Sequence, residues 1–308
     1  MQPDPSLPAP PGVEHCYRHP GEETRVHCTR CGRPICPQCM IPAPVGYQCP
    51  DCVAEARREF KAGPGKRLRW MGLSPTRILI GVLVLIYVLA ASASGPGRLM
   101  NGPTPSQMSR FGGADPLRIA FFAQYWRFIT SMFLHYGLLH LAFNCYALWL
   151  LGTHAERDFG PWRFIVVYLV TGIAGGAASY AFGLGVGAGA SGAIFGVMGA
   201  FLAFNYARRN TRIARMNVQW VWQILILNAF IAFGVSTIDW HAHAGGFVAG
   251  VLIGSLLDRA RNLSRAAQVG GVALLLILSF ASIAWRTSDL RSTYSQAQVI
   301  HFYDQQGG

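Results

Sequence analysis

The sequence predicts an all-α polytopic membrane protein with a small metal-binding module in front of its membrane-spanning helices. Of its 308 residues, 52% are hydrophobic and only 13% are charged, whereas about 25% of an ordinary soluble protein is charged. Residues 1–78 hold 18 of the 40 Asp, Glu, Lys and Arg residues, and long charge-free stretches follow them. Seven of the eight cysteines lie between Cys16 and Cys52. This pattern excludes a disordered or collagenous chain and argues against a single soluble globule.

The first 77 residues divide into three segments. Residues 1–13 carry five prolines and predict a disordered arm. Residues 14–54 form a Cys/His module in which Arg and acidic residues balance. We therefore do not expect the module to bind nucleic acid, although the whole chain has a net charge of +12. Residues 55–77 are a basic linker, which suits the anionic lipid headgroups beside a first span.

The module contains four ligand pairs, each separated by two residues: Cys16 and His19, Cys28 and Cys31, Cys36 and Cys39, and Cys49 and Cys52. These make two complete four-ligand sets, which is typical of structural zinc sites. A module of about 40 residues also needs a cross-link, such as a bound metal ion or disulfides, to fold. We therefore predict two structural Zn²⁺ ions, with the pairing of ligands left open by the spacing.

Disulfides are the alternative use of such cysteines. The first 15 residues lack the basic start and apolar core of a signal peptide. We therefore expect the amino terminus to remain in the cytoplasm, where thiols stay reduced and a metal site is favoured.

The charge-free stretches locate the spans. They cover residues 78–97, 128–155, 164–207, 216–238, 240–257 and 266–285. A bilayer core needs about 20 apolar residues as helix, so the 44-residue stretch 164–207, broken by GLGVGAGASGA, contains two spans. Seven transmembrane helices are predicted, in a core over 78–259 and a seventh helix over 266–285.

The short connections predict the orientation. The gaps 208–215 and 258–265 hold four and three Arg, whereas GLGVGAGA and the turn at Asp239 hold no Lys or Arg. Because positive loops stay in the cytoplasm, we expect a cytoplasmic amino terminus and an external tail over 286–308. The connection 98–127 is then external, and its composition predicts a folded loop.

Glycine spacing predicts which helices touch. Gly246, Gly250 and Gly254 recur on the sixth predicted helix, and Gly192, Gly196 and Gly199 recur on the fourth. Small residues at this spacing let helix backbones approach closely in lipid. We expect the fourth and sixth helices to be a close pair.

Polar side chains within apolar spans are costly and point to function. They lie near the external ends of the second, fourth and sixth helices: His135, His140, Asn144, Ser191, His241 and His243. A serine with a neighbouring histidine base permits acyl transfer, and His140, Asn144 and a backbone N–H at a helix start could stabilise an oxyanion. The simpler interpretations are that Ser191 caps its helix and that each histidine packs. We assign Asp239 to capping the sixth helix, not to a catalytic triad.

These residues occur in motifs that resemble those of the rhomboid family of intramembrane serine proteases. The resemblance covers about residues 78–259 and rests on several motifs in order: Trp126-Arg127; His135, His140 and Asn144; Leu151-Gly152, Glu156 and Gly160; Gly189, Ser191 and Gly192; and Ala242, His243 and Gly246. It implies a rhomboid-like six-helix fold, to which the seventh helix is an addition without a catalytic role. The spacing of the last motif, Ala242, His243 and Gly246, favours His243 over His241 as the functional histidine, and we assign His241 to packing.

The resemblance also implies roles. Ser191 would be the nucleophile and His243 the base, and His140, Asn144 and the Ser191 N–H would form the oxyanion hole. Phe195 stands where many members have Tyr, and it could stack on the base. The substrates would be transmembrane segments of other proteins, cut near their outer ends in the plasma membrane.

The Cys/His module resembles a B-box-type zinc finger, for which interleaved ligand pairs are expected. We expect it to bind a cytoplasmic protein partner.

The sequence leaves two alternatives to a protease. A rhomboid-like protein could bind membrane clients without cutting them, although such a protein would usually lack Ser191 or His243. A metal transporter could use the histidines, but no Asp or Glu lies within any charge-free span.

Overall fold

The computed structural model describes residues 14–43, 45–61, 74–234, 238–259 and 264–305. The chain forms two compact units, Met1–Gly72 and Leu73–Gly308. The predicted disordered arm over residues 1–13 and most of the predicted basic linker lie outside the described residues.

The first unit is a small module with little regular structure. Two short antiparallel pairs, β1 (Glu14–His15) with β2 (Glu23–Thr24) and β3 (Ile41–Pro42) with β4 (Tyr47–Gln48), flank a 3-10 turn over Pro37–Cys39. Helix α1 (Pro50–Lys61) follows, so the linker predicted to begin at residue 55 is helical at its start. The buried core consists of six cysteines and Ile35, too little apolar surface to hold 40 residues without a cross-link.

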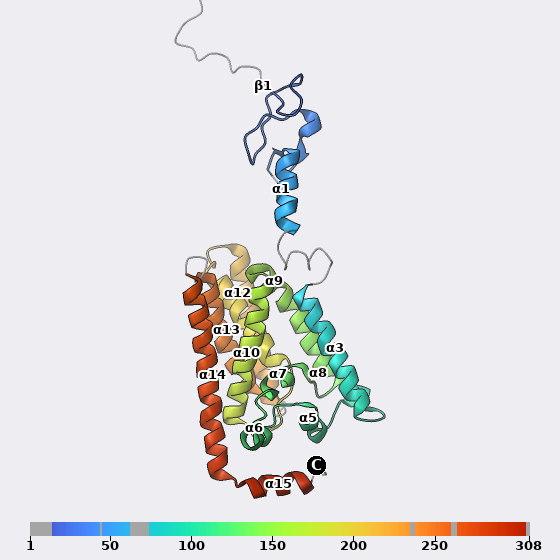
Figure 1. Cartoon of the computed structure of the whole chain (residues 1–308), viewed down its shortest axis with the longest axis vertical. Coiled ribbons are helices and arrows are strands. Elements are labelled where there is room, and N and C mark those ends of the chain that lie inside the picture. The colour runs from blue at the N-terminus through green and yellow to red at the C-terminus, as the bar shows by residue number, and fades with distance from the viewer. Residues whose placement is uncertain (1–13, 44, 62–73, 235–237, 260–263, 306–308) are drawn as a thin grey trace, which may run out of the picture. The chain divides into compact units, whose positions relative to one another are not determined.

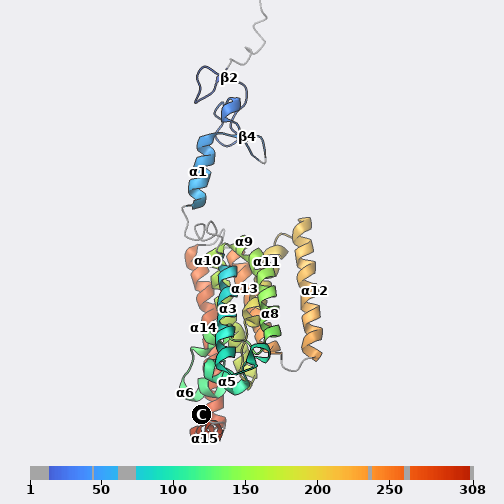
Figure 2. The ribbon, with the colours of Figure 1, turned by 90° about the vertical axis from the view of Figure 1, so that its right-hand side faces the viewer.

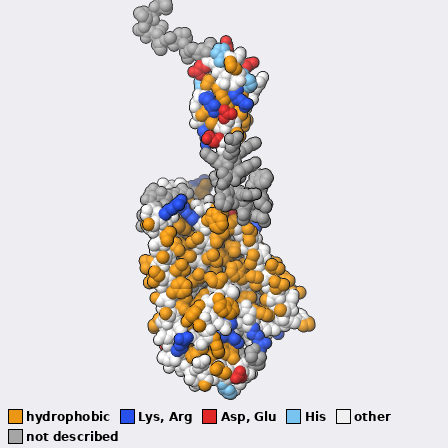
Figure 3. Space-filling view, in the orientation of Figure 1, with side chains coloured by type: hydrophobic (Ala, Val, Ile, Leu, Met, Phe, Trp, Pro, Cys, Tyr) orange, Lys and Arg blue, Asp and Glu red, His pale blue; other side chains and the backbone are white. Residues whose placement is uncertain are grey.

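The second unit is a bundle in which helices coincide with all seven predicted segments (Figures 1 and 2). The long helices are α3 (Pro75–Ala93), α10 (Pro161–Phe182), α11 (Ser191–Tyr206), α12 (Arg212–Gly234), α13 (Trp240–Arg259) and α14 (Arg265–Thr293). By length and composition, four helices of the described chain could cross a membrane, α3, α10, α13 and α14, and one bent pair could be a fifth span. Hydrophobic side chains cover the middle of the face shown in Figure 3. The chain is thus a mostly helical, multi-pass membrane protein, and the count of seven spans stays a prediction.

The second predicted span is not one straight helix. It consists of α7 (Arg127–Thr130), a 3-10 turn (Ser131–Phe133), α8 (Leu138–Ala147), a π-helical turn (Leu148–Gly152) and α9 (Thr153–Phe159). The two parts meet at 94°. The buried guanidinium of Arg127 donates to the carbonyls of Ser109 and Gly113 at 2.6 and 2.7 Å. These bonds fix α7 to the connection 98–127, so α7 does not continue the axis of α8.

The connection 98–127 is folded, as predicted. It contains α4 (Arg98–Asn101), α5 (Pro105–Phe111) and α6 (Pro116–Phe122). Thr104 and Gln107 form a capping box at α5, and the Asp115 carboxylate accepts the Leu117 and Arg118 N–H groups at the start of α6. Caps of this kind satisfy the free N–H groups of a first turn.

The seventh helix is longer than predicted. The charge-free stretch predicted that this helix ends at Trp285, but α14 continues to Thr293 and is followed by α15 (Gln296–Gln305). The predicted tail over 286–308 is therefore largely helical. Beyond Trp285, Thr287 hydrogen-bonds Tyr180 at 2.9 Å and Leu290 is buried. Tertiary contacts thus extend the helix past its apolar segment.

Helices α11 and α13 are in direct backbone contact, which confirms the predicted close pair. A Cβ atom placed on Gly246 would lie 2.0 Å from the Gly192 carbonyl oxygen, and one on Gly250 would lie 2.0 Å from that of Gly196. Only glycine permits this approach, the small-residue packing expected in lipid. The contact aligns the amino-terminal ends of both helices.

Substitution of Gly250 by Ala is expected to destabilise the bundle by about 1–3 kcal/mol, since the added methyl overpacks this contact. Thermal unfolding in detergent micelles should show a lower Tm. Gly81→Ala on α3 is the matched control, because no atom lies within 4 Å of its added Cβ. Equal shifts in the two variants would contradict the close contact.

Candidate active site

Ser191 and His243 meet at the aligned ends of α11 and α13. His243 Nε2 lies 2.8 Å from Ser191 Oγ, and both side chains are half-buried. Ser191 is the first residue of α11, and its N-cap, Ala190, makes no side-chain capping bond. The interpretation of Ser191 as a helix cap is therefore wrong. The hydroxyl faces an imidazole from another helix instead.

Gly189 lets a second imidazole reach the serine. Its φ is +137°, a conformation that side chains disfavour. A Cβ atom there would lie 2.9 Å from Cε1 of His140 and 3.7 Å from Ser191 Oγ. The ring of His140 thus packs on the Gly189 backbone beside the serine hydroxyl.

An aromatic ring and a helix cap hold His243 in place. The Phe195 ring stacks on the imidazole with centroids 4.1 Å apart and planes 10° apart, the contact expected from the sequence. Asp239 accepts the Ala242 N–H at 3.0 Å and the Ser179 hydroxyl, which confirms its role as the α13 cap. The His243 backbone N–H donates to the Asp239 carbonyl at 3.3 Å.

Asn144 and His135 surround His140. The Asn144 side chain is buried, and one of its N–H groups donates to the His140 carbonyl at 3.0 Å. The amide has a second N–H for another acceptor. His135 is buried, its ring nitrogens have no hydrogen-bond partner in the described chain, and its ring meets His140 edge-on at 5.1 Å. His135 therefore packs behind His140.

Other residues singled out from the sequence lie elsewhere. Arg127 lies over the exposed Trp126 ring at 4.8 Å, so this pair stabilises the end of the connection 98–127. His241 stacks on Phe182 with centroids 5.5 Å apart and contacts Trp240, as expected for a packing residue. His241 is thus packed against aromatic rings, apart from the other three histidines that a metal transporter could use, which lie around Ser191.

Sequence reasoning missed the bonds that brace the loop between α10 and α11. Ala114 and Gly187 exchange backbone hydrogen bonds of 2.8 and 2.9 Å, and the Tyr136 hydroxyl donates to the Val186 carbonyl. Gly189 N–H donates to the Ser131 carbonyl at 2.9 Å. An isolated pair of bridging residues has no periodicity, so no sequence signal marks it.

The arrangement provides the parts for acyl transfer. A serine hydroxyl is activated when a neighbouring base accepts its proton. The N–H groups of a helix start have no intrahelical acceptor, and the His140 ring lies near Ser191 at the start of α11. Donors aimed at one point can stabilise an oxyanion.

The cysteines and His19 of the first unit form two clusters, and each brings its four ligand atoms within 4.8 Å of one another. One cluster is Cys16, His19, Cys36 and Cys39, and the other is Cys28, Cys31, Cys49 and Cys52. The first pair of ligands thus groups with the third and the second with the fourth, the interleaved pairing that the B-box resemblance implied. Sulfur and imidazole donors in sets of four fit tetrahedral zinc.

Hydrogen bonds lower the pKa of three of these thiols, which favours the thiolate that binds a metal. Burial raises the pKa of the Cys28 thiol, but hydrogen bonds from surrounding backbone N–H groups outweigh burial and lower its pKa to about 6. Arg33, which the sequence did not single out, donates to Cys31 Sγ at 3.3 Å and to Cys49 Sγ at 3.6 Å. Its positive charge compensates the all-cysteine cluster, as outer-shell partners of metal ligands do.

Comparison with known proteins identifies relatives of the second unit. Residues 123–260 match the Rhomboid domain family. The rhomboid protease GluP of Bacillus subtilis is 34% identical over 206 residues, which are 67% of this chain and 38% of GluP. The rhomboid-family protein YdcA of Bacillus subtilis is 36% identical over 135 residues, 43% of this chain and 67% of YdcA.

A third relative, Inactive RHOMBOID-like protein 8 of Arabidopsis thaliana, is 35% identical over 153 residues, 48% of this chain and 43% of that protein. The chain therefore spans less than half the length of GluP and of this relative.

Proposed function

Because this chain belongs to the rhomboid family, we propose that it is an intramembrane serine endopeptidase that cleaves transmembrane segments of other proteins. Ser191 is the nucleophile and His243 is the base. The observation that carries this proposal is the 2.8 Å contact between Ser191 Oγ and His243 Nε2, made by two helices whose backbones touch. Family membership alone leaves catalysis open, since one relative is named inactive.

The reaction proceeds in two steps. His243 Nε2 accepts the hydroxyl proton as Ser191 Oγ attacks the scissile carbonyl, and it returns that proton to the leaving amine as the C–N bond breaks. Water then gives a proton to His243 and attacks the acyl ester, and His243 returns that proton to Ser191 Oγ as the ester C–O bond breaks, which releases the acid and restores the serine. The Ser191 N–H, His140 and Asn144 stabilise the oxyanion of both intermediates.

The depth of the pair suggests where substrates are cut. Ser191 and His243 lie at the amino-terminal ends of α11 and α13, whereas the Arg-rich connections 208–215 and 258–265 follow their carboxyl ends. With positive loops in the cytoplasm, the site opens toward the external face of the plasma membrane. We propose seven spans, a cytoplasmic amino terminus and cleavage near the outer ends of substrate helices.

We propose that the first unit holds two structural Zn²⁺ ions in its two ligand clusters. Bound zinc supplies a cross-link that a core of cysteines and Ile35 cannot. The module then serves as a cytoplasmic domain for binding a protein partner. Its balanced charge argues against a nucleic-acid ligand.

A non-catalytic protein that binds membrane clients is the second candidate, because Inactive RHOMBOID-like protein 8 is similar over 48% of this chain. The hydrogen-bonded Ser191 and His243 favour the enzyme. A client-binding protein has no need of a serine hydroxyl within bonding distance of an imidazole in a span, where polar groups are costly.

Replacing either member of the pair should abolish proteolysis. Ser191→Ala and His243→Ala are each expected to lower the cleavage rate of a reporter transmembrane substrate in liposomes by at least about 10³-fold. His241→Ala, two residues away and packed against Phe182, and Ser279→Ala on α14 are the matched controls. Gel analysis of the products measures the rate. Equal cleavage by the wild type and all four variants would refute the dyad.

Metal content tests the clusters. The full chain purified from zinc-supplemented cells should contain two zinc ions per molecule by mass spectrometry. Cys16→Ser and Cys49→Ser should each lose about one, because each removes a ligand from a different cluster. Cys145→Ser, outside both clusters, should keep two. Loss of both ions in each single variant, or no zinc in the wild type, would contradict two independent sites.

A further inference from the structure

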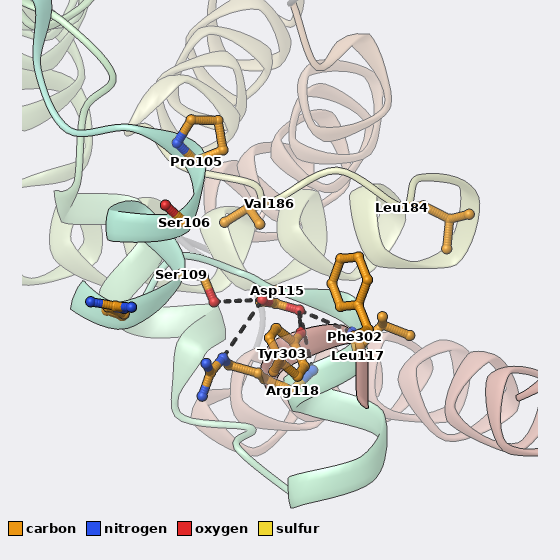
Figure 4. A pocket seen from close by; sticks show the side chains of 11 residues that line it. Pro105, Ser106, Ser109, Asp115, Leu117, Arg118, Leu184, Val186, Phe302 and Tyr303 are labelled. Carbon is orange, nitrogen blue, oxygen red and sulfur yellow. Dashed lines mark hydrogen bonds and ion pairs between the residues drawn. The ribbon is translucent and has the colours of Figure 1, made fainter. Parts of the chain in front are cut away.

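Helix α15 makes a specific contact with the external loop. The Tyr303 hydroxyl donates to Asp115 Oδ1 at 2.7 Å, and Asp115 Oδ2 accepts the Ser109 hydroxyl at 2.5 Å (Figure 4). The Arg118 guanidinium lies 4.3 Å from the centre of the Tyr303 ring. The Asp115 carboxylate, which caps α6, therefore joins α5, α6 and α15.

Helix α14 holds α15 in this place. Arg291 Nε donates to the Ala120 carbonyl at 2.7 Å, across 171 residues of chain. Val299 of α15 is buried, and the rings of Tyr303 and Phe122 meet edge-on with centroids 6.3 Å apart. These contacts fix α15 against α6 independently of the Asp115 bond.

A continuous set of bonds leads from Asp115 to the serine. The Asp115 N–H donates to the Gly113 carbonyl at 2.8 Å, and the next residue back along the chain, Ala114, exchanges two backbone bonds with Gly187. Two residues after Gly187, the Gly189 backbone supports the His140 ring. Asp115 is thus next to a backbone pairing between the external loop and the loop that precedes Ser191.

The same region has room to move. A cavity of about 230 Å³ lies between α5, α6, α15 and the loop after α10, and Figure 4 shows Val186 and Leu184 on its far side from Tyr303. Packed interiors transmit small shifts, whereas an adjoining void lets a released segment relax. Loss of the Tyr303 bond would therefore allow the Asp115 segment to shift.

We infer that Tyr303 is a positioning residue for the active site. Through Asp115 it holds the backbone of residues 113–115 in register with Gly187, and so keeps Gly189, His140 and Ser191 in place. The inference rests on the proposed function, and it gives the carboxyl-terminal helices a role beyond anchoring.

The test uses Tyr303→Phe in the full chain, which removes only the hydroxyl. Covalent labelling of Ser191 by a small fluorophosphonate reports the geometry of the nucleophile without the binding of a transmembrane substrate. Its rate is expected to fall roughly three- to tenfold, about the net effect of losing one ordinary hydrogen bond. Deuterium uptake should rise in peptides covering 109–115 and 183–190. Tyr294→Phe, from the same carboxyl-terminal segment, is the control.

The readouts separate the possible failures. A variant that is merely less stable would show a lower Tm with unchanged labelling per folded molecule, and that result would overturn the inference. Increased exchange without slower labelling would overturn it too, since the loop would then loosen without affecting the site. If the wild type were not labelled at Ser191, the proposed function would fail, and unchanged exchange in Tyr303→Phe would independently reject the tie between α15 and the loop.

Discussion

The structure of the second unit depends on the direct contact between the backbones of α11 and α13. Lipid tails are as apolar as leucine, so little hydrophobic force drives helices together within a bilayer. Glycine removes the side chains that would separate the two backbones, and close dispersion contact can then hold them together. Ser and His have short side chains, and they bond across the helix pair only because the helices lie this near. Packing and proposed chemistry thus share one cause.

The polar groups of this unit are stable in an apolar setting because most of them satisfy one another. Ser191 bonds His243, Asn144 bonds the backbone of its own helix, and the buried Glu156 accepts the Thr76 hydroxyl at 2.9 Å. Unpaired polar groups are expensive in such surroundings. His135 is the exception within the site, since both its ring nitrogens lack a partner in the described residues. Its one ring contact within the site is the edge-on packing against His140.

The sequence was sufficient for those features that local spacing determines. Glycines three or four positions apart predicted the α11–α13 contact, and pairs of ligands with two residues between them predicted the clusters. Family resemblance then added the interleaved pairing.

Features that depend on distant partners were not predictable. Arg127 begins an apolar stretch, yet its guanidinium binds carbonyls in the loop 98–127, so the predicted second span breaks after α7. Arg286 suggested the end of a span, but it pairs with Asp289 one turn later within the same helix. Counting charges reveals neither interaction. Backbone carbonyls carry no formal charge, and the count treats Asp289 as one more charge and not as the partner of Arg286.

The proposed active site is assembled almost entirely from the starts of helices. Ser191 is the first residue of α11, His140 is the third residue of α8, and His243 is the fourth residue of α13. Helix amino termini carry a partial positive charge and free N–H groups. Three such ends directed at one place favour the negative charge that develops on a carbonyl oxygen during attack by the serine. In the proposed reaction, the oxyanion is thereby stabilised without an arginine or lysine in the membrane. Asp239, by capping α13, sets the first turn from which His243 reaches the serine.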